Sequence, residues 1–214
     1  MKKFIALLLA LSLFCGLSCA VAETTGNENL VFDTINYDST AVSGNWYGFN
    51  DLFYFNLPET WAPVEVEDAT FDQGVRFWAN TPDNTEMFFL LFTSAEELNG
   101  VGDAGTMAAA AEAECTDVKL ALVNGIPMVC YTDADDIRYA QFFTDSGDAF
   151  ALAFFPASDE NVQAYMTSVL ASFTTDISSL GEDITVVNVE KGIKLSEKDA
   201  FTIVVDWFKG LLGV

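Results

Sequence analysis

Three aspartates that lie close together are the residues best suited to metal chemistry. Asp133, Asp135 and Asp136 follow an apolar segment, and carboxylate oxygens grouped in a loop are the ligands that calcium prefers. An EF-hand loop starting at Asp133 needs glycine at its sixth position and glutamate at its twelfth, where this chain has Arg138 and Thr144. Two interpretations follow, a calcium site or a solvated turn whose charge Arg138 offsets, and the missing motif favours the turn.

A second pair of carboxylates, Glu65 and Glu67, lies in a segment where valine and glutamate alternate. In a strand this spacing places both carboxylates on one face, as glycosidases that use paired carboxylates require. Val64 and Val66 then occupy the other face, which is the usual pattern of a sheet with one solvated side. We expect such a solvated face, with a carboxylate-dependent hydrolase, for example one that acts on carbohydrate, as the alternative.

The chain has no histidine. This excludes nucleophiles activated by histidine and zinc sites that use histidine ligands. An enzyme here would have to use carboxylates, lysine, tyrosine or cysteine, and we expect instead a non-catalytic binding protein without a cofactor. Aromatic side chains that could stack on a sugar or a peptide are Trp46, Tyr47 and Trp61. Phe201 and Phe208 near the carboxyl terminus are further candidates for a ligand or partner surface. The alternative for the first three is that they cover the core of a small sheet.

Residues 1–22 have the features of a secretory signal peptide. Two lysines precede an apolar run, and an Ala-Val-Ala sequence ends at Ala22. We expect cleavage after Ala22 and a secreted or extracytoplasmic protein, although the run is also long enough to remain as a membrane anchor. Neither Cys15 nor Cys19 has a branched aliphatic residue three positions earlier, so we do not expect a lipoprotein.

Export would leave two cysteines, Cys115 and Cys130, in an oxidising compartment, where a pair often forms a disulfide. Asn-Gly at residues 124–125 predicts a tight hairpin turn between two strands. This register places Cys130 opposite Lys119 and Cys115 several residues further along, beyond bonding reach unless the chain there folds back. A disulfide and two separate thiols both remain open.

The chain is strongly acidic, with 32 acidic and 9 basic residues and a formal net charge of −23. Nucleic acid and anionic lipid surfaces repel such a chain, and the charge by itself keeps an exported protein soluble. Hydrophobic residues make up 51% of the chain, so most of it must fold. We expect a monomer that binds an unknown protein or envelope component, with no nucleic acid and no membrane partner after cleavage.

The elements that must position these residues are mainly short strands. Patterns of alternating or continuous apolar residues predict strands over residues 52–57, 64–68, 75–79, 87–93, 118–123, 126–132, 139–144 and 149–155. Helices are expected over residues 106–114 and, with Ser158 and Asp159 as capping residues, up to Phe173. Residues 23–45 read as a polar tail or linker. Hairpins dominate and βαβ alternation is missing, which predicts an α+β domain with an antiparallel sheet covered by helices, an α/β/α sandwich.

Residues 176–214 are predicted to form a carboxyl-terminal extension with a strand over 184–189 and a final helix. The apolar stripe of that helix consists of Phe201, Val204, Val205, Phe208, Leu211 and Leu212. Two roles remain open for it, packing back on the domain or docking on a partner or a membrane surface, although its polar face lacks the basic bias of a membrane-surface helix.

Four short sequence patterns occur in an order that resembles a known family. They are F-x-x-P-E-x-W at residues 55–61, Asn-Gly-Ile-Pro at 124–127, Tyr-Ala-Gln-Phe-Phe at 139–143 and the helix pattern at 162–173. Over residues 46–175 the chain resembles the PsbP-like superfamily, which includes PsbP and the DcrB-type proteins. The resemblance implies an α/β/α sandwich that binds partners and has no active site of its own, and it identifies no functional residue here.

Overall fold

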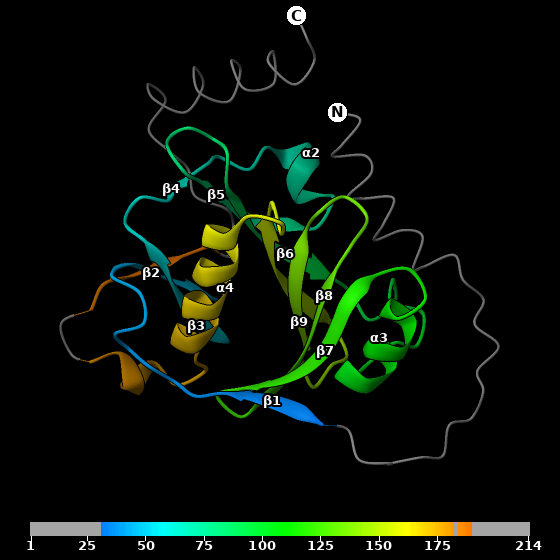
Figure 1. Ribbon diagram of the computed structural model, residues 1–214. Helices are drawn as coiled ribbons and strands as arrows, with labels where there is room; N and C mark the ends of the chain where they lie inside the picture. The colour runs from blue at the N-terminus through cyan, green and yellow to red at the C-terminus, as the bar shows by residue number, and fades with distance from the viewer. Residues whose placement is uncertain (1–30, 182–183, 190–214) are drawn as a thin grey trace, which may run out of the picture.

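Short strands and few helices give this chain an α+β fold, seen in a computed structural model that describes residues 31–181 and 184–189 (Figure 1). A large mixed sheet has the strand order β1-β7-β8-β9-β10-β6-β5-β4, and a smaller sheet has the order β11-β2-β3. The strands of the large sheet are β1 (Phe32–Ile35), β4 (Ala62–Pro63), β5 (Val75–Asn80), β6 (Met87–Thr93), β7 (Thr116–Val123), β8 (Ile126–Thr132), β9 (Arg138–Phe143) and β10 (Ala149–Phe155). The smaller sheet consists of β2 (Gly44–Phe49), β3 (Phe53–Pro58) and β11 (Val186–Asn188).

Hairpins build the centre of the large sheet, as the sequence predicted. Strands β7, β8, β9 and β10 pair antiparallel in succession, and β10 then pairs with β6. Asn124 and Gly125 both have positive φ, of 50° and 86°, as a two-residue hairpin turn requires. The sheet is not purely antiparallel, because β1 runs parallel to β7 at one edge. The small sheet is mixed too, since β11 runs parallel to β2.

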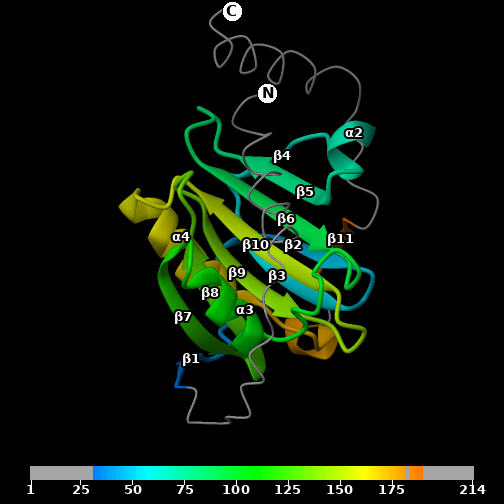
Figure 2. The same cartoon turned by 90° about the vertical axis from the view of Figure 1, so that its right-hand side faces the viewer.

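The two faces of the large sheet are covered by different elements (Figures 1 and 2). Helix α3 (Ala104–Ala111) packs on one face against Val129, Tyr131 and other side chains of β8 and β9. Helix α4 (Glu160–Ser172) and the small sheet pack on the other face, against the alternate side chains of the same strands. Each strand therefore contributes one set of side chains to each core, as the twofold period of a strand dictates.

Helix α4 forms where the sequence placed it. Asp159 is its N-cap, and the carboxylate of Asp159 accepts a hydrogen bond of 2.8 Å from the backbone N–H of Asn161. Its buried side chains include Val162, Met166 and Val169, which recur at the spacing of one helical face. The helix contacts β3 and β10 and thereby joins the small sheet to the large one.

Two regions differ from the sequence prediction. The expected polar tail contains β1 and the start of β2, because Phe32–Ile35 pairs with β7 far along the chain. The expected edge strand over residues 64–68 does not form: the short strand β4 ends before it, and the short helix α2 (Asp68–Phe71) begins at its last residue. Val64 still attaches this segment to the sheet, because its N–H donates to the carbonyl of Trp78.

The described part of the predicted extension packs on the same body. A 3-10 helix η1 (Ile177–Leu180) buries Leu180 beside Trp46, and Val189 is fully buried in the core next to β11. The predicted final helix, with Phe201 and Phe208, lies outside the described residues. Among the helices that the structure describes, none combines the length and apolar character needed to span a bilayer.

Candidate functional site

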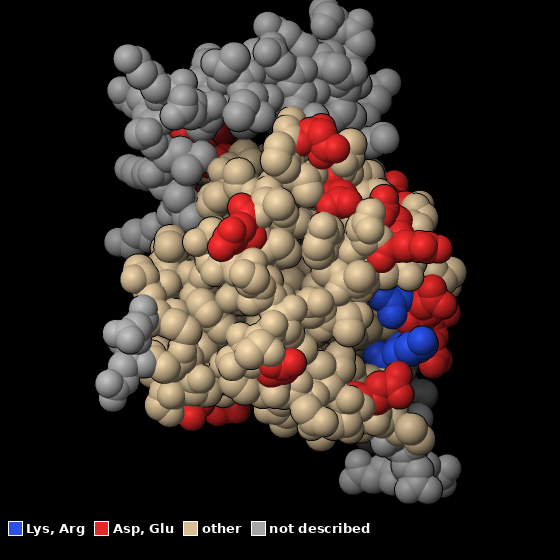
Figure 3. Space-filling model, turned by 60° about the vertical axis from the view of Figure 1, so that its left-hand side comes forward, with Lys and Arg blue, Asp and Glu red and all other residues tan. Residues whose placement is uncertain are grey.

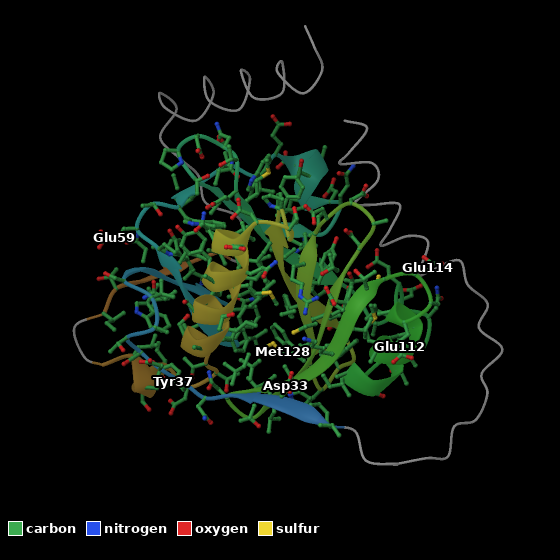
Figure 4. The ribbon with its side chains drawn as sticks, in the orientation of Figure 1. Asp33, Tyr37, Glu59, Glu112, Glu114 and Met128 are labelled. Atoms are coloured by element: carbon green, nitrogen blue, oxygen red, sulfur yellow. The ribbon has the colours of Figure 1, made fainter. Side chains whose placement is uncertain are left out.

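A cleft of about 340 Å³ opens between helix α4 and one end of strands β1, β7, β8 and β9. One part of its lining is apolar and consists of Ile35, Ala121, Cys130, Ala157, Met166 and Leu170. The polar part consists of Thr132, Gln163 and Thr167, and the charged part consists of Asp33, Asp117, Lys119 and Arg138. In Figure 4, the labelled Asp33 on β1 and Met128 on β8 lie in the region between the ribbons of α4 and β7.

The strand register explains why these side chains share a face. Lys119 pairs with Cys130 across β7 and β8, and Thr132 pairs with Arg138 across β8 and β9. Because side chains alternate along a strand, residues opposite one another project to the same side of the sheet. This side is the one that packs on α4, since Cys130 belongs to the same core as the helix.

Arg138 reaches across the middle strand of the three. Its Nη1 donates to Thr132 Oγ1 on β8 at 2.9 Å and to the carbonyl oxygen of Asp117 on β7 at 3.1 Å. The carboxylate of Asp117 lies 4.0 Å from the same nitrogen, but its side chain is 73% exposed, so this ion pair is solvent-screened. The sequence interpretation that Arg138 offsets the nearby aspartates is therefore not what the structure shows. The guanidinium instead lies over β8, on the side of the sheet occupied by Lys119.

Basic side chains are scarce in the described part of the chain, which contains only Arg76, Lys119 and Arg138. Arg76 is engaged elsewhere, with its guanidinium carbon 4.1 Å from the ring centroid of Phe71. The other two both line the cleft. Figure 3 shows one face of the molecule, where a small blue group of basic side chains is bordered by red acidic ones. The cleft therefore gathers the positive charge that the described fold makes available.

Cys130 lies on the floor of the cleft. Burial raises the pKa of its thiol to about 11, against the opposing influence of Arg138 and Lys119. Burial also raises the pKa of Cys115 to about 11. Both cysteines are free thiols, and they belong to opposite faces of the sheet, Cys130 with α4 and Cys115 with α3. The disulfide alternative is therefore corrected to two separate thiols, because the sheet lies between them.

Two of the three aspartates proposed as calcium ligands, Asp133 and Asp136, accept hydrogen bonds from the protein itself, whereas Asp135 is exposed. One oxygen of Asp133 accepts hydrogen bonds from the N–H groups of Asp135 and Ile137, and the other accepts from the Tyr139 hydroxyl. Asp136 accepts from the backbone and the hydroxyl of Ser158, which ties this turn to the start of α4. Within residues 31–181 and 184–189, no group of three possible metal ligands comes together. These hydrogen bonds favour the turn interpretation, in which the carboxylates of Asp133 and Asp136 hold the loop in shape.

The stability contribution of Asp133 is expected to depend on pH. Burial raises the pKa of this carboxyl, although the hydrogen bonds from Ile137, Tyr139 and Asp135 oppose the effect. A carboxyl whose pKa is higher in the folded state favours folding at acidic pH, and that contribution is lost as pH rises through the folded-state pKa. From about pH 4, the ordinary range of aspartate, to pH 7, wild type should therefore lose stability relative to Asp133→Asn.

Urea unfolding of both proteins at several pH values measures this difference. Asp145→Asn, which removes the same charge from an exposed residue outside this turn, is the control for the change in net charge. Parallel profiles for wild type and Asp133→Asn would show that burial of this carboxyl has no effect on folding.

The other residues singled out from the sequence do not form a site. Trp46, Tyr47 and Trp61 are 6%, 2% and 1% exposed, so they cover the core and cannot present a stacking surface in this fold. Glu65 and Glu67 are exposed on the chain after β4 rather than on a strand. Lys119, Gln163 and Thr167 were not identified in advance. The sequence contained one signal for Lys119: basic residues are rare in this chain, and Lys119 lies in a predicted strand.

Comparisons with known proteins add little to this site. No family model matches the chain, and no curated protein matches it. Among solved structures, it is similar to a crystal structure from Bacteroides thetaiotaomicron VPI-5482, with 15% identity and a TM-score of 0.42. The match covers 64% of this chain and 50% of the other, so the chain spans about half the length of that protein.

Proposed function

We propose that this chain is an exported, non-catalytic binding domain of the PsbP-like α/β/α type, whose ligand site is the cleft between α4 and strands β1, β7, β8 and β9. The observation that carries the proposal is the cleft itself. It has a volume of about 340 Å³, an apolar wall and a few polar and charged groups that converge on it. Small-molecule sites in proteins commonly have this size and this mixture of lining groups.

The protonation and charge pairing of the potentially reactive groups in the cleft support ligand binding rather than catalysis. The Cys130 thiol has a raised pKa, so little of it is the thiolate that nucleophilic catalysis requires. The carboxylate of Asp117 faces a guanidinium, and histidine is missing from the chain to serve as a base. The hydrolase alternative would need two carboxylates that work together, whereas in this cleft Asp33 and Asp117 stand beside two cations.

Three probes with the same eight-carbon tail test the proposal: octanol, octanoate and octylamine. Each is titrated into isotope-labelled protein, and backbone amide signals are followed by NMR. If the cleft is a binding site, at least one probe should shift a saturable set of signals confined to α4 and the ends of β7, β8 and β9. If none of the three does so, the proposed function is overturned.

Two matched variants separate the cleft from the rest of the helix surface. Thr167 and Ala164 are both exposed on α4, but only Thr167 lines the cleft. A tryptophan at Thr167 fills the space, so Thr167→Trp should abolish the saturable shifts. Ala164→Trp should leave them unchanged. Equal behaviour of the two variants would place the binding outside the cleft.

A further inference from the structure

We infer that the ligand of this cleft is a small apolar monocarboxylate, whose carboxylate binds between Arg138 and Lys119 and whose apolar part lies against α4. This inference rests on the proposed function, because it names the ligand class of the same site. It starts from the distribution of charge. Of the three basic residues that the structure describes, the two without an aromatic partner both line one cleft of a chain whose net charge is −23.

Both cations keep hydrogen-bond donors for a ligand. The hydrogen bonds that Arg138 makes to described residues all leave from Nη1, so Nε and Nη2 remain available. Lys119 is exposed and has no hydrogen bond or ion pair to any residue in the described ranges. A guanidinium held in place by Thr132 and Asp117 is already oriented, which lowers the entropy cost of binding a carboxylate.

The two cationic side chains lie in the same part of the cleft. Arg138 extends over β8 to the carbonyl of Asp117, which lies in an irregular part of β7, and Lys119 two residues further on lines the same cleft. Both cations also act on the pKa of one thiol, that of Cys130 between them. A single ligand group placed above Cys130 can therefore meet both side chains.

The acidic groups of the cleft limit the charge of the ligand. Asp33 and Asp117 line the same space, so the four charged side chains sum to zero. A dianionic ligand such as a phosphate monoester would be repelled by both of these carboxylates. A ligand with a single carboxylate can instead lie at the part of the cleft occupied by the two cations. A planar carboxylate can also accept two parallel hydrogen bonds from one guanidinium group.

The apolar wall of the cleft favours a ligand whose remaining part is apolar. Ile35, Ala121, Met166 and Leu170 line the cleft beyond the charged groups, and removing an apolar ligand chain from water against them favours binding. Methionine adapts its shape to different ligands, which suits a site for a class of apolar acids. An acid with a hydrocarbon chain or an aromatic ring satisfies both parts of the cleft.

The test compares the affinities of octanoate, octanol and octylamine, measured by the same NMR titration. Octanoate should bind about tenfold more tightly than either of the others, the effect of roughly one charge-assisted contact. If octanol or octylamine binds in the cleft as tightly as octanoate, this inference is overturned and the proposed function stands. If no probe binds there, the proposed function itself fails.

Substitutions then assign the effect to named side chains. Lys119→Gln should weaken octanoate binding about threefold to tenfold and leave octanol binding unchanged, because only the charged contact is lost. Gln73→Glu changes the net charge by the same amount at an exposed site away from the cleft and should have no effect. An equal loss in both variants would show that overall charge, and not Lys119, controls binding.

Discussion

Phe53→Ala is expected to lower the free energy of unfolding by about 3–5 kcal/mol, the usual cost of removing a buried phenylalanine. The side chain is 1% exposed and lies at the junction of three elements. Its ring centroid is 5.1 Å from those of Phe142 on β9 and Phe150 on β10, and 5.5 Å from that of Phe173 at the end of α4. Truncation would leave a cavity between the small sheet, the large sheet and the helix that borders the cleft.

Leu52→Ala is the matched control, because Leu52 is the neighbouring residue and is 48% exposed. Its cost should stay below about 1 kcal/mol, since much of the removed surface is already in water. Chemical denaturation followed by tryptophan fluorescence measures both variants. Similar losses in the two would mean that the aromatic cluster around Phe53 does not hold the two sheets together.

Gly44→Ala is expected to lower the free energy of unfolding by about 3 kcal/mol or more, since the clash involves backbone atoms that cannot rotate away. An added Cβ would lie 1.8 Å from the carbonyl oxygen of Leu57 and 2.9 Å from the nitrogen of Glu59. Gly44 pairs with Pro58 at the start of β2, so the end of the β2–β3 ladder would have to separate. The small sheet would then pack less well on α4.

Gly102→Ala provides the comparison for Gly44→Ala. A Cβ at Gly102 meets nothing within 4 Å, and its φ lies outside the left-handed region. This change should be neutral or should stabilise the protein by up to about 1 kcal/mol, because alanine restricts the unfolded chain. Thermal and urea unfolding of the two variants test the contrast. An equally small effect at Gly44 would show that β2 and β3 can move apart without cost.

Local patterns in the sequence determined most of the individual elements. Strands β6 and β8 begin and end where the apolar runs do, at Met87–Thr93 and Ile126–Thr132. The Asn124-Gly125 turn and the Asp159 cap formed as predicted. These features depend on interactions between residues a few positions apart, which the order of residue types specifies directly. The α+β class follows from the same patterns.

Tertiary structure alone decided the features that depend on residues far apart in the chain. Strand β1 lies in a segment that looks like a polar tail, because its order comes from pairing with β7. Whether Trp46 and Trp61 are exposed depended on distant residues, because Trp46 packs against Leu180 of η1 and Trp61 lies in the core shared with α4.

The candidate site was decided in the same way. The sequence suggested that Arg138 offsets the charge of the aspartates near it in the chain. In the structure its side chain extends across a strand to Asp117, and α4 forms the other wall of the cleft. A long side chain on a sheet meets its cross-strand neighbours as readily as its sequence neighbours, and strand order is not written in any local pattern. The sequence therefore determined the elements and the overall charge, whereas only the packing of the sheet and helix brought the two cations into one cleft.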